Sequence, residues 1–83
     1  MSSSEFQWVA HRHAVERLLQ LKPAERAAIM SECDRLASNP YVEPDATFRD
    51  AAGSPLATRI IGKRVVTCHV DHAVKQVQIL AIE

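Results

Sequence analysis

The chain has 83 residues, of which 47% are apolar and 24% are charged, and ten Lys and Arg balance ten Asp and Glu. This composition is typical of one small globular domain and argues against a disordered chain. It also argues against a general nucleic-acid-binding protein, which normally carries a broad basic excess, so any contact with phosphate groups must be local.

The first residues, 1–5, are short and polar, and no apolar segment that resembles a signal peptide follows them. No stretch approaches the roughly 18 apolar residues of a membrane span. We therefore expect a single cytoplasmic domain over residues 1–83, with residues 1–4 disordered and no contact with a membrane. Cys33 and Cys68 lack the spacing of a disulfide framework or a zinc site, so we expect buried, reduced thiols and neither metal nor cofactor.

Two helices follow a short first strand in the predicted order. Alternation over residues 5–11 predicts the strand, and from Arg12 the apolar period becomes helical, with Arg12 and Glu16 able to pair. Pro23 is suited to the first position of a second helix, which ends at Ser38–Pro40. The apolar residues of the two helical patterns are Ala14, Val15, Leu18 and Leu19, then Ile29, Met30, Cys33, Leu36 and Ala37. The short link between them predicts an antiparallel helical hairpin.

The second half of the chain predicts strands. Residues 41–54 have no clear period, although a short edge strand fits near 47–49. Strand patterns then cover 56–61, 64–71 and 75–82. Strand, two helices and three strands together predict an α+β fold, in which the helical hairpin covers one face of a mostly antiparallel sheet.

Three cations, Arg59, Lys63 and Arg64, surround Gly62 at a predicted turn. A two-residue Gly62-Lys63 turn of type II′ pairs Ile61 with Arg64, Ile60 with Val65, Arg59 with Val66 and Thr58 with Thr67. Arg59 and Arg64 then share one face of the ribbon, with Lys63 at its tip, so together they could clamp a phosphate. The alternative is that this face is buried against the core, with the arginine heads reaching solvent; a one-residue register shift would reverse the assignment.

Two strings of the sequence, AVERLLQLKPAERAAIMSECDRLASNP and GKRVVTCHVDHAVKQVQILAI, resemble the RelE/ParE toxin superfamily of bacterial type II toxin–antitoxin modules. The resemblance covers about residues 6–82. It lies in a helical hairpin that closes on a proline, a glycine–x–arginine strand, an aspartate before the next turn, and a last apolar strand.

This resemblance implies growth inhibition, plasmid stabilisation and a cognate antitoxin that wraps over the toxin. The RelE branch cleaves messenger RNA on the ribosome without metal, by attack of a 2′-hydroxyl group on the adjacent phosphate, and the ParE branch inhibits DNA gyrase. Arg64 matches the arginine that contacts phosphate in RNA-cleaving members, and Arg59 lies roughly where those members have a lysine. The resemblance therefore implies Arg64 and Arg59 as catalytic residues, with Lys63 as a further phosphate ligand.

Two departures from the nuclease pattern leave other functions open. RNA-cleaving members are basic and continue past the last strand into a basic segment with a terminal tyrosine or histidine. This sequence is neutral and has no matching residues after Glu83. The alternatives are a non-enzymatic, ParE-like gyrase inhibitor and a catalytically inactive, protein-binding homodimer, whose exposed sheet edge could accept a partner strand.

The histidines offer weaker candidates. His11 and His13 are two residues apart and do not face each other on a helix, so we expect a capping or surface role rather than a metal site. His69 lies five residues from Arg64 and therefore on the opposite face of a regular strand; only a bulge would allow it to act as a proton donor. We expect Asp71 to accept hydrogen bonds from turn amides.

Aromatic residues complete the candidates. Phe6 and Trp8 are interpreted as core or dimer-interface residues rather than base-stacking ones. Phe48, Arg49 and Asp50, in the long loop, either contact a partner or fasten the loop to the sheet.

Overall fold

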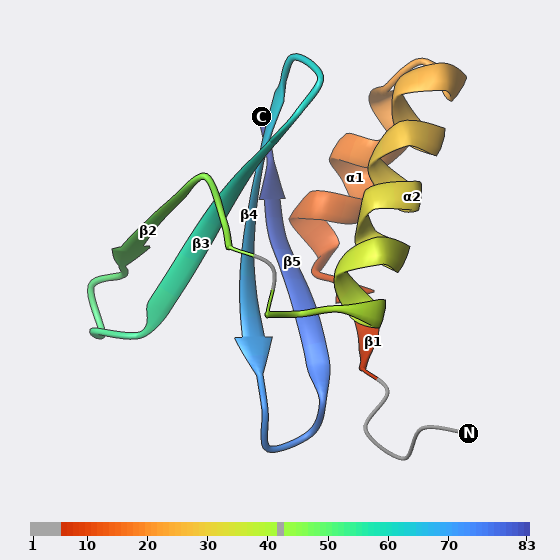
Figure 1. Cartoon of the computed structure of the whole chain (residues 1–83). Helices are drawn as coiled ribbons and strands as arrows, with labels where there is room; N and C mark the ends of the chain where they lie inside the picture. Colours follow the sequence, from red (N-terminus) through yellow and green to blue (C-terminus); the bar gives the residue numbers. More distant parts are fainter. Residues whose placement is uncertain (1–5, 42) are drawn as a thin grey trace.

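The computed structural model describes residues 6–41 and 43–83, so the expectation for residues 1–4 lies outside the described part of the chain. The elements in chain order are β1 (Gln7–Ala10), α1 (Arg12–Gln20), α2 (Pro23–Ser38), β2 (Ala46–Arg49), β3 (Pro55–Ile61), β4 (Arg64–Asp71) and β5 (Gln76–Ile82). The predicted order is confirmed, and the edge strand expected near 47–49 is β2 (Figure 1).

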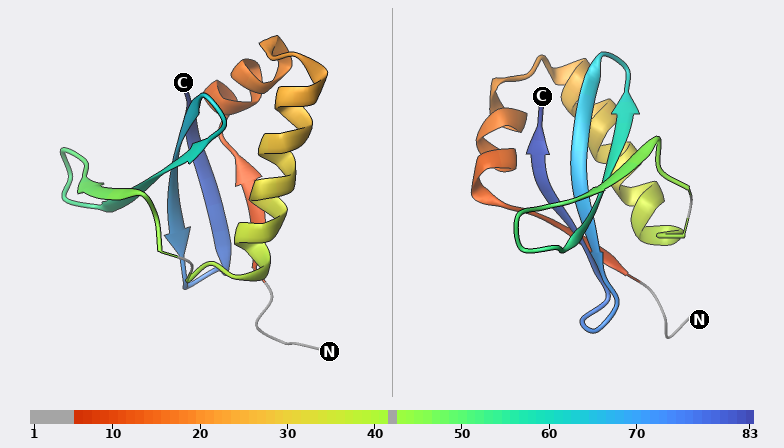
Figure 2. Two further views of the ribbon diagram at one scale, coloured as in Figure 1. Left: turned by 45° about the horizontal axis from the view of Figure 1, so that its top comes forward. Right: turned by 90° about the vertical axis from the view of Figure 1, so that its left-hand side faces the viewer.

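The strands form one sheet in the order β1-β5-β4-β3-β2. β1 runs parallel to β5, and every other neighbouring pair is antiparallel. Both helices cover the same face of this sheet, whereas β2 and the adjoining part of β3 extend away from them (Figure 2). The predicted α+β class, with a helical hairpin on one face of a mostly antiparallel sheet, is confirmed.

The two helices pack mainly against the sheet rather than against each other. On α1, Ala14 and Leu18 are buried, but Val15 is 40% and Leu19 69% exposed. The sequence expectation of a four-residue apolar face was therefore wrong for half of that face. The reason is that α2 does not cover the side of α1 that carries Val15 and Leu19, so a narrow stripe spaced by four residues suffices to pack α1 on β5.

The second helix, α2, follows the predicted pattern closely. Pro23 is at its first position, and Ile29, Cys33 and Leu36 are buried at its sheet-facing side. Met30, which was expected to widen this apolar stripe, is 41% exposed. The helix ends at Ser38, where the Asn39 amide still donates to carbonyl groups of the last turn.

The turn between β3 and β4 has the predicted register. Ile61 pairs with Arg64, Arg59 with Val66 and Thr58 with Thr67. Gly62 has φ 63°, and among the non-glycine residues that the structure describes only Lys75 has a positive φ. Lys63 therefore has a negative φ, as a type II′ turn requires after its glycine.

The core lies between the helices and the sheet, and among the described residues no polar or charged side chain is buried in it. Its members are Phe6, Ala14, Leu18, Leu21, Ile29, Cys33, Leu36, Val66, Cys68, Val77, Ile79 and Ile82. Both cysteines are free and buried, and burial raises the pKa of the Cys33 thiol to about 12. Neither helix is long and apolar enough to cross a membrane, over the residues that the structure describes.

Candidate functional site

The candidate site is a recess between the β3–β4 turn and the start of α2. It has a volume of about 530 Å³ and is lined by Lys22, Glu25, Gly62, Lys63 and Arg64. The turn aims Lys63 and Arg64 at the recess because Gly62 adopts the left-handed conformation that reverses the chain within two residues. Lys22 and Glu25 come from the opposite side, where Pro23 starts the helix. The recess therefore holds three cations and one carboxylate.

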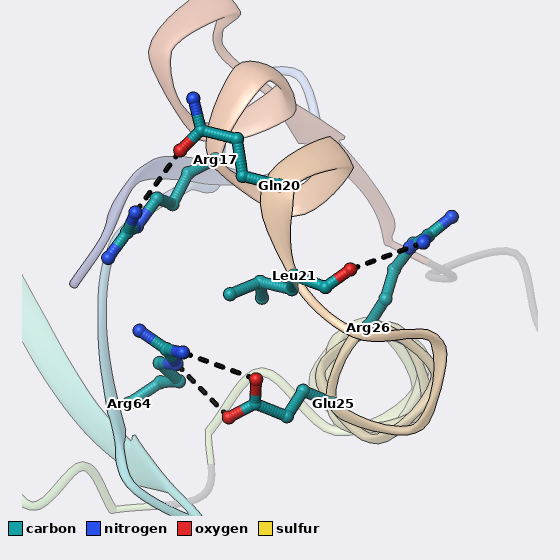
Figure 3. Close-up of polar contacts among 6 residues, drawn as sticks. All are labelled: Arg17, Gln20, Leu21, Glu25, Arg26 and Arg64. Carbon is teal, nitrogen blue, oxygen red and sulfur yellow. Dashed lines mark hydrogen bonds and ion pairs between the residues drawn. The ribbon is translucent and has the colours of Figure 1, made fainter.

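Arg64 and Glu25, which both line this recess, form a two-pronged ion pair (Figure 3). Nε of Arg64 donates to Oε2 of Glu25 and Nη2 donates to Oε1, both at 3.2 Å. The two side chains are only 26% and 31% exposed, so water screens the pair less than a surface contact. Hydrogen bonds from Arg64 lower the pKa of the Glu25 carboxyl, and the charges of Lys22 and Lys63 act in the same direction, while partial burial opposes them.

Arg59 shares a sheet face with Arg64, as predicted, but it is in different surroundings. Its cross-strand partner Val66 is completely buried, so this is the helix-covered face that the alternative interpretation anticipated. The Arg59 guanidinium donates from Nη1 to the backbone carbonyl of Glu43 at 3.4 Å. It lines a second recess of about 230 Å³, between α2 and β3, whose other polar residues are Glu32, Arg35, Glu43 and Asp45. The structure thus brings Lys63 and Arg64 together and separates Arg59 from them.

The chemistry available in the recess is that of an anion site. The bond to Glu25 occupies Nε and Nη2 of Arg64, the edge that a second anion would need for a two-pronged contact, and the ammonium groups of Lys22 and Lys63 line the same recess. None of the four histidines, all within the described residues, lines this recess. Across residues 6–41 and 43–83, no group of three His, Cys, Asp or Glu side chains could hold a metal ion.

Sequence reasoning missed two residues of this site, Lys22 and Glu25. Glu25 is the acidic residue in the first turn of α2, and its carboxylate binds Arg64, 39 residues further along the chain. A signal was present, because the helix start and the glycine turn were both predicted correctly. Predicting their contact required the angle at which the helices cross the sheet, and no local pattern gives that angle.

The histidines and Asp71 either make local hydrogen bonds or are exposed to solvent. Nδ1 of His69 lies 2.9 Å from the carbonyl oxygen of Pro55. His69 and Arg64 are on opposite faces of β4, as expected. Asp71 accepts the Ala73 amide in the β4–β5 turn, which confirms its predicted role. His11 occupies the N-cap position of α1, but its side chain makes no capping hydrogen bond, and it is exposed, as is His13.

Most of the aromatic and loop candidates pack against the core or form hydrogen bonds within the fold. Phe6 is buried, and Trp8 packs against the core while its Nε1 donates to Oδ1 of Asp34 at 2.8 Å. Asp50 accepts the amides of Ala52 and Ser54, and Arg49 donates to the carbonyl of Gly53. The β2–β3 loop is therefore fastened by its own polar groups, while Phe48 stays 46% exposed.

No model of a known protein family matches the sequence, and no curated protein matches it by sequence comparison. Solved structures do match. A chain of the RelBE2 toxin–antitoxin complex from Mycobacterium tuberculosis superimposes with a TM-score of 0.78 at 18% identity, covering 95% of this chain and 96% of that one. A chain of the archaeal RelE–RelB complex from Pyrococcus horikoshii gives 0.79 at 19% identity, covering 95% and 93%.

The E. coli toxin RelE itself, as a double arginine-to-alanine mutant in the free state, gives a TM-score of 0.74 at 9% identity, covering 94% of this chain and 81% of that one. The chain has the fold of RelE toxins. At these identities the likeness to RelE shows the fold alone and assigns no role to Arg59, Lys63 or Arg64.

Proposed function

We propose that this RelE-fold protein is the toxin-like component of a bacterial type II toxin–antitoxin pair, held inactive by a cognate antitoxin. The observation that carries the proposal is the match over nearly the whole chain to chains of two RelE–RelB-type complexes. A fold alone does not determine an activity. The antitoxin partner is favoured because such complexes recur among the structural neighbours from a bacterium and an archaeon.

The activity we propose is inhibition of translation, by metal-independent cleavage of messenger RNA at the ribosome. Arg64 would bind the phosphate at the cleaved bond and stabilise the charge that builds up there, with Lys63 as a second cation at the turn. Arg59, in the neighbouring recess, would contact the RNA backbone further along. The recess with Lys22, Lys63 and Arg64 supports this proposal, because it concentrates positive charge on a protein whose net charge is zero.

A second candidate is a non-enzymatic function, either ParE-like inhibition of DNA gyrase or protein binding by a catalytically inactive homodimer. Two observations favour it. The Arg64 guanidinium is already bound by Glu25 through two hydrogen bonds, and no histidine lines the recess to move a proton. Such an inhibitor needs a binding surface and no catalytic acid.

Induced expression in a bacterium, followed by mapping of transcript 5′ ends and assay of DNA breaks, tests the proposal. Growth arrest with new 5′ ends on ribosome-bound transcripts supports RNA cleavage. Arrest with gyrase-type DNA damage supports the second candidate, and unimpaired growth contradicts a toxin-like role. A short neighbouring reading frame whose product relieves the arrest and co-purifies with this chain would identify the antitoxin.

A further inference from the structure

We propose that Glu25 is an autoinhibitory residue: its carboxylate occupies the anion site formed by Lys22, Lys63 and Arg64, and a phosphate group must displace it to bind there. The inference takes the identity of that phosphate, an RNA backbone phosphate, from the proposed function. Its physical content, the competition between two anions for one arginine, is independent of any toxic activity.

The first observation that supports this proposal is the geometry of the ion pair. A carboxylate that accepts from Nε and Nη2 of one guanidinium uses the same edge that a phosphate uses for two-pronged binding. Both Glu25 oxygens are engaged in this way at 3.2 Å. The carboxylate thus stands where two phosphate oxygens would stand, and the two anions cannot hold that edge of Arg64 together.

The second supporting observation is the positive charge around the pair. Within residues 6–41 and 43–83, neither Lys22 nor Lys63 forms an ion pair, although both line the recess. Their charges help to keep Glu25 ionised, since they act to lower its pKa. With Glu25 ionised the four side chains carry a net charge of +2, and a phosphate that displaced it would meet all three cations.

The third supporting observation is the position of the two residues in the fold. Glu25 lies in the first turn of α2, held by Pro23 and the buried helix face, and Arg64 opens β4 directly after the glycine turn. Glu25 is a flexible side chain on a fixed backbone, so a change of rotamer alone releases Arg64. Displacement therefore needs no rearrangement of the fold.

The experiment is a titration of the folded protein with inorganic pyrophosphate, and then with a short single-stranded RNA, at constant ionic strength, following the amide NMR signals of residues 62–64. Glu25→Gln removes the competing charge and keeps the size of the side chain. Glu16→Gln is the matched control, because it removes the same charge from an exposed ion pair on α1. We expect Glu25→Gln to tighten pyrophosphate binding by about tenfold, the effect of one unit charge at close range, and Glu16→Gln to change it by less than about twofold.

Arg64→Ala, alone and combined with Glu25→Gln, completes a double-mutant cycle, and the gain should be clearly smaller when Arg64 is absent, because only the charge repulsion from Glu25 is then removed. Glu25→Asp, which keeps the charge but shortens the reach, replaces Glu25→Gln if that variant does not fold, and should give an intermediate gain. Equal binding by the Glu25 and Glu16 variants, or a gain that is undiminished without Arg64, would overturn the proposal. Tighter pyrophosphate binding without tighter RNA binding, or without growth arrest on expression, would leave the autoinhibitory contact standing and count against the proposed function.

Discussion

Ile79 and Ile82 are both buried at the same face of β5, although an odd number of positions separates them. Regular alternation would put them on opposite faces. The pairing of β4 with β5 shifts between Thr67 and Cys68: Thr67 pairs with Ala81 and Cys68 with Ile79, so Leu80 is an extra residue in β5. This bulge lets the last strand contribute to the core on both sides of the irregularity.

The first prediction tests this arrangement. Ile82→Ala should lower the free energy of unfolding by about 2–5 kcal/mol, because it leaves a cavity in a packed core. Ile60→Ala is the matched control: it deletes the same atoms from a strand residue that is 63% exposed, and should cost less than about 1 kcal/mol. Urea denaturation of both variants measures the difference. Equal losses would mean that Ile82 is not a core residue.

The sequence was sufficient for features whose cause is local. Pro23 defined the start of α2, and Gly62 with the β-branched residues beside it defined the turn, its type and the register of β3 with β4. Each follows from the backbone preference of one residue type, which does not depend on the rest of the chain. Alternation in β4 likewise placed Val66 and Cys68 on one face and His69 on the other.

Features set by packing between elements could not be read from the sequence. Val15 and Leu19 have the helical spacing of core residues, and only the position of α2 leaves them exposed. The extra residue at Leu80 disturbs the period in a run that is apolar throughout, so it leaves no signal in the pattern. The candidate site depended on the same kind of information, since the Glu25–Arg64 contact arises from how α2 lies across the sheet.

The second prediction concerns Gly62. An added Cβ would meet no atom within 4 Å, so a substitution there tests backbone strain alone. Gly62→Ala should destabilise the protein by about 1–2 kcal/mol because an L side chain rarely adopts φ 63°. Lys63→Ala, one residue later at negative φ, should change stability by less than about 0.5 kcal/mol. Thermal or urea unfolding of the two variants is the measurement, and a neutral Gly62→Ala would contradict the left-handed turn.

The third prediction concerns the buried thiols. Burial raises the pKa of both Cys33 and Cys68, Cys33 to about 12, so neither forms a thiolate near neutral pH in the folded state. Iodoacetamide at pH 8 should leave both unmodified in the native protein and modify both in urea. Because the folded-state pKa is raised, the contribution of Cys33 to stability is complete below pH 9.0, its ordinary pKa, and is lost as the pH rises towards about 12.

Cys33→Ala provides the control for this pH dependence. It removes the titrating group, so its stability should fall less steeply than that of the unmodified chain above pH 9.0. Rapid alkylation of the native protein would indicate that one of the thiols is accessible.

The fourth prediction concerns Glu25. Its pKa is lowered in the folded protein, chiefly by the hydrogen bonds from Arg64, so its contribution to stability is present above 4.5, the ordinary value, and is lost as the pH falls below it. The stability difference between the unmodified chain and Glu25→Gln should therefore shrink as the pH is lowered through this range. Urea titrations at several pH values measure this, with Glu16→Gln as the control. A difference that does not change with pH would show that Glu25 is not held ionised by Arg64.

The last prediction separates the two proposed activities. If the protein cleaves RNA, replacing Arg64 by Ala should lower the cleavage rate by about 100- to 1,000-fold, the usual effect of removing one group that stabilises charge in a transition state. Arg64→Lys should recover part of this loss, because a lysine keeps the charge but cannot make the two-pronged contact. Arg12→Ala, which removes an equal charge from a side chain that is 93% exposed, should leave cleavage unchanged.

Growth arrest and transcript-end mapping on expression of the three variants provide the measurement, and circular dichroism shows that each is folded. Undiminished arrest by a folded Arg64→Ala variant would assign the toxic activity to a binding surface instead. Arg64 would then contribute to the protein only through Glu25, as the bond between the β3–β4 turn and the start of α2.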